Sequence, residues 1–81
     1  MPYFVYVLKS LSSGRSYIGS TNNLQNRLLR HNNNESKATK GKGPWELLYH
    51  EQYQTRSDAV KRERFFKSVE GRIELKNRGL L

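Results

Sequence analysis

The pattern of apolar and polar positions divides the start of the chain into two extended segments. Residues 3–8 are aromatic or aliphatic throughout, which is typical of a strand covered on both faces. Turn residues follow at 11–15, and residues 16–19 return to an extended pattern. We therefore predict a β-hairpin over residues 3–19, and Gly19 at its end permits a close approach of the backbone.

A helix is predicted next. Residues 21–23, Thr-Asn-Asn, offer three N-cap side chains for a helix that runs to about Asn32. The predicted apolar stripe consists of Leu24, Leu28 and Leu29. Arg27 and His31 are four residues apart, so they share a different face of this helix.

Residues 32–44 are polar, basic and glycine-bearing, and predict a mobile loop. A third strand follows over residues 45–53. The side chains expected together on one side of it are Trp45, Leu47, Tyr49 and Tyr53.

A second helix is predicted from about residue 57 to 69, capped by Thr55 or Ser57. At 100° per residue its apolar arc consists of Ala59, Val60, Phe65, Phe66 and Val69. Gly71 is expected to end this helix, before a short helix over 72–78.

Glu63 is the exception in the apolar arc. A buried carboxylate without a partner is costly, so Glu63 is expected to be ion-paired or bound to a metal. Arg27 and Arg62 are the candidate partners for an ion pair. The spacing of residues leaves both interpretations open.

Length and composition narrow the class of protein. A chain of 81 residues is sufficient for one small domain, which we place at residues 1–81. Zero cysteines exclude disulfides and thiolate zinc sites, and two histidines make a histidine-built metal centre a poor fit. No apolar run approaches the roughly 20 residues of a membrane span, so we expect a cytoplasmic protein.

Charge points to a polyanionic partner. The chain carries 15 Lys and Arg against 7 Asp and Glu, a net charge of +8. Residues 9–42 hold seven basic residues and the single acid Glu35. Such a one-signed segment favours nucleic acid as the partner, although a ribosome-like basic protein has the same composition. An anionic membrane is a poorer partner, because no predicted helix combines a basic face with exposed Trp, Leu or Phe.

Several hydrolytic centres are excluded. There is no cysteine nucleophile, and the only aspartate, Asp58, is expected in the first turn of a surface helix rather than in a Ser-His-Asp triad. The acids are spread singly, so no pair is spaced to hold two metal ions.

Five short motifs follow one another along the chain: Phe4-Val5-Tyr6, Tyr17-Ile18-Gly19, Arg27 with His31, Glu63, and Gly71-Arg72. Together they resemble the GIY-YIG nuclease domain, which also occurs in intron-homing endonucleases and in the nuclease subunit of bacterial excision repair. The chain is especially similar to small stand-alone bacterial members, over about residues 3–78. In the first motif, Phe4 and Val5 replace the glycine and isoleucine of the family pattern.

The resemblance implies an α+β fold, with a small three-stranded antiparallel sheet flanked by helices. It also implies phosphodiester hydrolysis with one divalent cation, Mg²⁺ or Mn²⁺. Tyr17 would be the general base, assisted by Tyr6. Arg27 would stabilise charge on the phosphate, His31 would position groups or relay a proton, and Glu63 would be catalytic by holding the metal.

The expected partner is nucleic acid, with DNA ahead of RNA. The predicted phosphate-binding residues are Arg15, Arg30, Lys37, Lys40 and Lys42. We expect low intrinsic sequence specificity, with the target set by nucleic-acid structure or by a partner protein, and a role in DNA repair or recombination. Two alternatives are a non-catalytic nucleic-acid-binding module on the same fold and a small protein that docks on an acidic partner.

Overall fold

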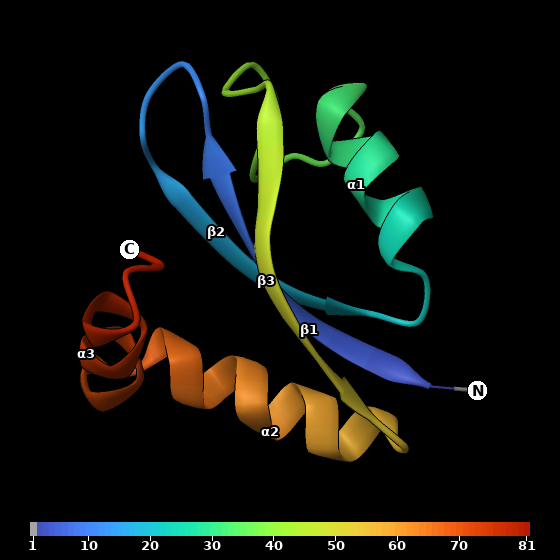
Figure 1. Ribbon diagram of the computed structural model, residues 1–81. Helices are drawn as coiled ribbons and strands as arrows, with labels where there is room; N and C mark the ends of the chain where they lie inside the picture. The colour runs from blue at the N-terminus through green and yellow to red at the C-terminus, as the bar shows by residue number, and fades with distance from the viewer. Residues whose placement is uncertain (1) are drawn as a thin grey trace.

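Three strands and three helices make up the computed structural model, which describes residues 2–81 (Figure 1). Met1, the first residue of the predicted domain, lies outside the described residues. The elements are β1 (Tyr3–Ser10), β2 (Ser16–Thr21), α1 (Leu24–Asn32), β3 (Trp45–Tyr53), α2 (Arg56–Lys67) and α3 (Val69–Asn77). The predicted α+β fold is confirmed.

The strands form one antiparallel sheet in the order β2-β1-β3, with β1 at its centre. Its residues 5–8 are at most 2% exposed, so the prediction of a strand covered on both faces is correct. Side chains alternate between the faces of a strand. Val5 and Val7 therefore pack toward α2 and α3, whereas Tyr6 and Leu8 pack toward α1.

Each face of the sheet has its own apolar cluster. Figure 1 shows α1 on one side of the sheet and α2 and α3 on the other. The cluster on the α2 and α3 face contains Val5, Val7, Ile18, Ala59, Phe66 and Leu75. The cluster on the α1 face contains Tyr6, Leu8 and Trp45, with Tyr17, Leu24, Leu28 and Leu47 packed against it. β1 contributes to both clusters, and the site described below lies at the edge strand beside it.

A bulge in β3 corrects the prediction for that strand. Val7 pairs with Tyr49, but its neighbour Leu8 pairs with Leu47, so Leu48 is an extra residue in the ladder. The extra residue reverses the alternation. Leu47 therefore lies on the α1 face with Trp45, whereas Tyr49 packs on the opposite face with Tyr53.

α1 begins after Asn23, whose side chain accepts the N–H of Asn26 at 3.0 Å. Leu24 and Leu28 pack against the sheet as predicted. Leu29 does not, and it is 62% exposed because it lies five residues, or about 140°, around the helix from Leu24. None of the helices between residues 2 and 81 has the length and hydropathy needed to cross a bilayer.

The predicted break between the last two helices was misplaced. α2 is capped by Thr55, as predicted, but it ends at Lys67. Ser68 follows with an extended backbone and caps α3, because its hydroxyl accepts a hydrogen bond from the N–H of Gly71. Gly71 lies inside α3, where a Cβ would collide with the backbone carbonyl of Phe65. It is therefore a packing glycine and not a helix breaker. Val69 begins α3 and is 76% exposed, so it does not belong to the apolar arc of α2.

Candidate active site

A buried hydrogen-bonded chain joins β1, α1 and the loop that follows α1. The hydroxyl of Tyr6 lies 3.0 Å from Nε2 of His31, and Nδ1 of His31 lies 2.7 Å from the hydroxyl of Thr39. All three residues are at most 2% exposed. Because hydroxyl groups can donate or accept, the chain accommodates either neutral tautomer of the imidazole. The face of α1 on which His31 was predicted is therefore buried at this end.

Burial sets the protonation states in this chain. It raises the pKa of Tyr6 well above its ordinary value, and the nearby Tyr17 adds to the effect. Burial also lowers the pKa of His31, helped by the positive charges of Arg27 and Arg30. At neutral pH, Tyr6 is therefore a neutral phenol and His31 a neutral imidazole in this hydrogen-bonded series.

Tyr17 lies on β2 on the same face of the sheet. Its ring centroid is 4.9 Å from that of His31 and 6.3 Å from that of Tyr6. Unlike Tyr6, it is partly exposed. No hydrogen bond within residues 2–81 occupies the Tyr17 hydroxyl, so it is available to water or a substrate.

Gly19 provides the space in which these aromatic rings meet. It pairs with Tyr6 across the β1–β2 ladder. A Cβ at this position would lie 2.5 Å from the Tyr6 hydroxyl oxygen and 3.1 Å from Cε2 of Tyr17. The predicted close approach at Gly19 is confirmed, and the group that approaches is a tyrosine side chain.

Glu63 reaches the site from the opposite face of the sheet. Ser20, the next residue after Gly19, points toward α2 and donates a hydrogen bond of 2.6 Å to Oε1 of Glu63. Lys67, one turn later on α2, donates a bond of 2.7 Å to Oε2. Partial burial alone raises the pKa of Glu63, but these hydrogen bonds outweigh it and lower the pKa. The ion-pair partner is therefore Lys67, and neither Arg27 nor Arg62 was the correct candidate.

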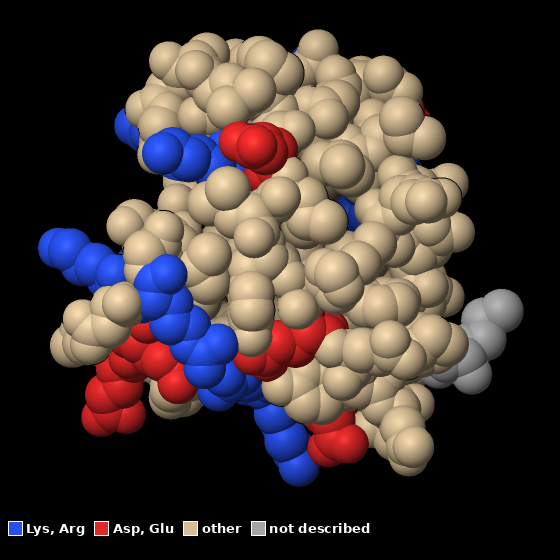
Figure 2. Space-filling view, in the orientation of Figure 1, with Lys and Arg blue, Asp and Glu red and all other residues tan. Residues whose placement is uncertain are grey.

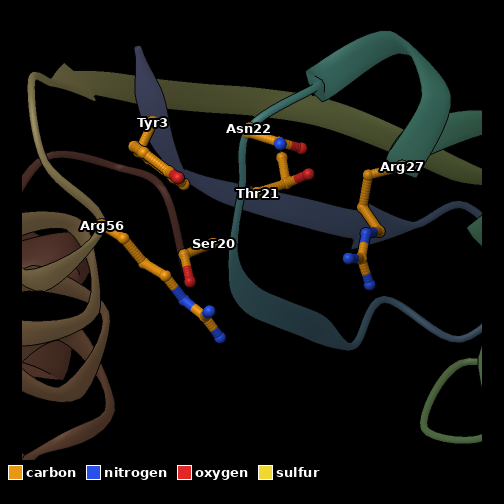
Figure 3. Close-up of a pocket in the computed structure, with 6 residues that line it drawn as sticks. All are labelled: Tyr3, Ser20, Thr21, Asn22, Arg27 and Arg56. Atoms are coloured by element: carbon orange, nitrogen blue, oxygen red, sulfur yellow. The ribbon is translucent and has the colours of Figure 1, made fainter. Parts of the chain in front are cut away.

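Arg27 stands on α1 close to both groups of residues. Its charge acts on the pKa values of Tyr6 and His31. It also lines an open pocket together with Ser20, the residue that binds Glu63 (Figure 3). Tyr6, Tyr17, Arg27 and His31 are thus gathered on one side of β2, and Glu63 lies just across this strand.

The match to a known family covers this whole site. The model of the GIY-YIG catalytic domain matches residues 2–77, which include every residue described above. The chain belongs to the GIY-YIG family. Family membership agrees with the resemblance of the separate sequence motifs.

Bacterial UPF0213 proteins are similar over most of the GIY-YIG chain. A UPF0213 protein of Staphylococcus epidermidis is 39% identical over 75 residues, which cover 91% of this chain and 90% of the relative. A UPF0213 protein of Bacillus pumilus is 42% identical over 67 residues, which cover 82% of this chain and 67% of the relative. The solution NMR structure of a UPF0213 protein from Bacillus halodurans has a TM-score of 0.58 at 25% identity, covering 99% of this chain and 87% of that one.

GIY-YIG nucleases generally use a divalent metal, and the carboxylate of Glu63 is suited to hold one. Mg²⁺ binds oxygen ligands and commonly retains several waters, so one carboxylate is enough of a protein anchor. Among residues 2–81 there is no group of three His, Cys, Asp or Glu side chains that would form a complete metal cage. An ion held by Glu63 would compete with the ammonium group of Lys67, which donates a hydrogen bond to Oε2.

The predicted phosphate-binding residues are all exposed. Arg15 lies in the β1–β2 turn, Arg30 on α1, and the other three in the loop after α1, namely Lys37, Lys40 and Lys42. None of the ion pairs found between residues 2 and 81 involves them. Their charges are therefore uncompensated by carboxylates within 4 Å.

Three acidic residues, in contrast, are paired with cations of α2. Arg62 contacts Glu51 at 2.8 Å and Glu74 at 3.2 Å, and Lys67 contacts Glu63. Figure 2 shows the result on one face, where blue and red side chains alternate over α2 and α3. All of the ion pairs found between residues 2 and 81 use cations of the second half of the chain, so the positive charge of the first half is uncompensated.

Two contributors to the site were missed in the sequence. Thr39 is a buried anchor inside a polar loop, and Ser20 connects β2 to Glu63. Ser20 lies directly after the Tyr-Ile-Gly motif, and strand alternation alone places it on the face opposite Gly19. No comparable local signal marks Thr39, because its partner His31 is brought to it by the folding of the loop.

Proposed function

We propose that this protein is a divalent-metal-dependent endonuclease that hydrolyses phosphodiester bonds in nucleic acid, with DNA as the expected substrate. The observation that carries the proposal is the gathering of five side chains around one edge strand. They are Tyr6, Tyr17, Arg27, His31 and Glu63. Membership of the GIY-YIG family supports it.

Tyr17 takes the role of general base. Its hydroxyl is not buried and has no hydrogen-bond partner within residues 2–81, so as the phenolate it can accept a proton from the water that attacks the phosphorus. Tyr6 is buried and is held as a phenol by its surroundings, which suits a group that positions rather than one that ionises. His31 fixes the Tyr6 hydroxyl through a bond of 3.0 Å.

Arg27 binds the phosphate whose negative charge increases in the transition state. The guanidinium presents a rigid fork of donors that matches two phosphate oxygens. When bound at Glu63, a divalent ion supplies additional positive charge at the same phosphate. Removing one such stabilising group typically costs about 100- to 1,000-fold in rate.

Binding is expected to depend weakly on base sequence and strongly on salt. The five exposed cations predicted for phosphate contacts carry no sequence information by themselves. Low specificity is compatible with a role in repair or recombination in which a partner protein selects the target.

The decisive experiment compares the wild type with Glu63→Ala on plasmid, single-stranded and branched DNA, in Mg²⁺ or Mn²⁺. Glu70→Ala, which removes an exposed acid of α3, is the matched control. We expect metal-dependent cleavage by the wild type and by the control, and none by Glu63→Ala. Equal cleavage by all three proteins would indicate a contaminating nuclease and contradict the assignment of Glu63.

No cleavage by any protein, with DNA binding retained in EDTA, would favour the non-catalytic binding module instead. The intact set of tyrosine, arginine and glutamate side chains speaks against that alternative, since a binding module needs no ordered Tyr6–His31 pair.

A further inference from the structure

A polar pocket lies beside the candidate active site, and of its lining residues only Arg27 is assigned to the reaction described above. Its volume is about 260 Å³. Its lining comes from both outer ends of the β1–β2 hairpin and from two helices: Tyr3, Ser20, Thr21, Asn22, Arg27 and Arg56 (Figure 3). Every one of these side chains carries a polar group, and none is acidic.

Two guanidinium groups dominate the pocket. Figure 3 shows Arg56 and Arg27 extending from either side of Ser20 toward the same open space. Within residues 2–81, neither has a carboxylate within 4 Å, in contrast to Arg62 and Arg78. Two unpaired arginines beside hydroxyl and amide groups are the donor set that recognises a phosphate.

Arg56 also occupies a position that local structure disfavours. It is the first residue of α2, directly after the cap Thr55. The N-terminus of a helix carries partial positive charge, so a cation there is destabilising. A residue that opposes local stability without a compensating partner is typical of a functional position.

The pocket is continuous with the candidate metal ligand. Arg56 and Glu63 are seven residues apart on α2, which places them on the same face of the helix about 10 Å apart. Ser20 lies between them, because it lines the pocket and binds Glu63. One DNA strand carries a phosphate every 3.4 Å of helix axis, so about 10 Å corresponds to a few nucleotides.

We infer that this pocket binds a backbone phosphate of the nucleic-acid strand, a few nucleotides from the bond that is cut, with Arg56 as its specific ligand. Arg27 lies between this subsite and the scissile phosphate. The inference rests on the proposed function, and it extends the contact surface to α2, outside the basic first half of the chain. It predicts one additional phosphate contact that does not depend on metal or on cleavage.

The test measures binding of a fluorescent DNA oligonucleotide in EDTA at a series of salt concentrations. The proteins are the wild type, Arg56→Gln, Arg56→Lys and the control Arg72→Gln, which removes the same charge from an exposed position of α3. Loss of one phosphate contact lowers the slope of log K against log salt by about 0.9 for duplex or about 0.7 for single-stranded DNA. We expect this change in Arg56→Gln and an unchanged slope in Arg56→Lys and Arg72→Gln.

Inorganic phosphate serves as a second probe. Its addition is expected to shift the backbone amide NMR signals of Thr21 and Asn22 in the wild type, but not in Arg56→Gln. Phosphate-induced shifts without any change in the DNA salt slope would mean that the pocket takes a free phosphate, and would overturn the nucleic-acid subsite. A wild-type slope in Arg56→Gln, an equal loss in Arg72→Gln, or no DNA binding by any protein would overturn it as well.

Failure of the subsite and failure of the proposed function give different results. A lower slope in Arg56→Gln together with absent cleavage supports the subsite and contradicts the nuclease. Normal cleavage by the wild type, together with an unchanged salt slope in Arg56→Gln, supports the nuclease and contradicts the subsite. Arg56→Gln is expected to fold at least as well as the wild type, since it removes an unfavourable charge from a helix N-terminus.

Discussion

The hydroxyl of Tyr6 and Nε2 of His31 lie 3.0 Å apart, in a part of the molecule from which water is almost entirely excluded. The other nitrogen of the ring is held by Thr39 in the loop after α1. The geometry of a proposed active-site tyrosine is therefore fixed by a loop that also carries Lys40, the next residue, and other exposed cations.

Thr39→Val should disturb the Tyr6–His31 pair while nearly preserving side-chain shape. It leaves Nδ1 of His31 buried without a partner, so we expect the free energy of unfolding to fall by about 1–3 kcal/mol. The ¹⁵N NMR shifts of His31 report the tautomer and should also change. Thr39→Ser restores the hydroxyl and should restore both quantities. Unchanged stability and unchanged His31 signals in Thr39→Val would mean that Thr39 only fills space.

Gly19→Ala should damage the site through sterics alone. The new methyl group would lie 2.5 Å from the Tyr6 hydroxyl oxygen, and a buried ring has no free space into which to move. We expect a loss of about 1–3 kcal/mol in unfolding free energy and loss of cleavage activity. Ser16→Ala, at the other end of the same strand, serves as the control. Chemical denaturation and the tyrosine near-ultraviolet circular dichroism measure the effect. Wild-type values in Gly19→Ala would contradict the described packing.

Lys67→Met should increase the affinity of Glu63 for a divalent ion. The ammonium group of Lys67 occupies Oε2 of Glu63 at 2.7 Å and competes with any cation. Exposed ion pairs contribute about 0.2–1 kcal/mol, so we expect up to about a fivefold gain in Mn²⁺ affinity. Titration of the protein without DNA, followed by electron paramagnetic resonance, measures it. Lys61→Met, an exposed cation on the same helix, should have little effect, and Glu63→Gln should abolish binding. An equal gain in Mn²⁺ affinity for Lys67→Met and Lys61→Met would show that the effect comes from net charge and not from the ion pair with Glu63.

Acid should destabilise the protein through Glu51. Partial burial by itself raises the pKa of Glu51, but hydrogen bonds outweigh it and lower the pKa from 4.5 to about 2. The donors are Arg62, Tyr49 and Tyr53. Because the folded state binds a proton less readily than the unfolded state, this stability is complete above about pH 4.5 and is lost as the pH falls toward about 2.

The expected loss between these two pH values is about 2–3 kcal/mol. It is measured by urea unfolding at a series of pH values. Glu51→Gln should be less stable at neutral pH and should show a flatter acid profile. Glu46→Gln, an exposed acid on the same strand, should keep the wild-type profile. If Glu51→Gln lost as much unfolding free energy at low pH as the wild type, the loss would have to come from other titratable groups.

The elements of the fold could be predicted from the sequence because each has a strong local signal. The apolar run of β1, the Asn23 cap and the Thr55 cap define their elements within a few residues. The failures occurred where tertiary packing decides. The bulge at Leu48 places the side chains before and after it on opposite faces of the sheet, whereas simple alternation predicts them on one face. Gly71 is needed for the close approach of the Phe65 backbone, and no helix ends there.

The candidate site was predictable to the extent that its residues occur in motifs. Tyr6, Tyr17 and Glu63 have a recognisable order along the chain. The helical spacing of Arg27 and His31 gave their common face, but not the burial of His31. Thr39 has no local signal, since the folding of the loop brings it to His31. Arg56 acquires its neighbours in the pocket only when α2 packs beside β2.

The two halves of the candidate site face opposite sides of one edge strand, and they depend on its register with β1. Gly19 pairs with Tyr6, and Ser20 pairs with Val5. A shift of one residue would turn every side chain of β2 to the other face. Ser20 would then face Tyr6, Tyr17 would leave that face, and Glu63 would lose its hydrogen bond. The turn at residues 11–15, although it holds none of the five proposed catalytic groups, is therefore part of what specifies them, and changes in its length are a means to switch the whole site off without altering any of its residues.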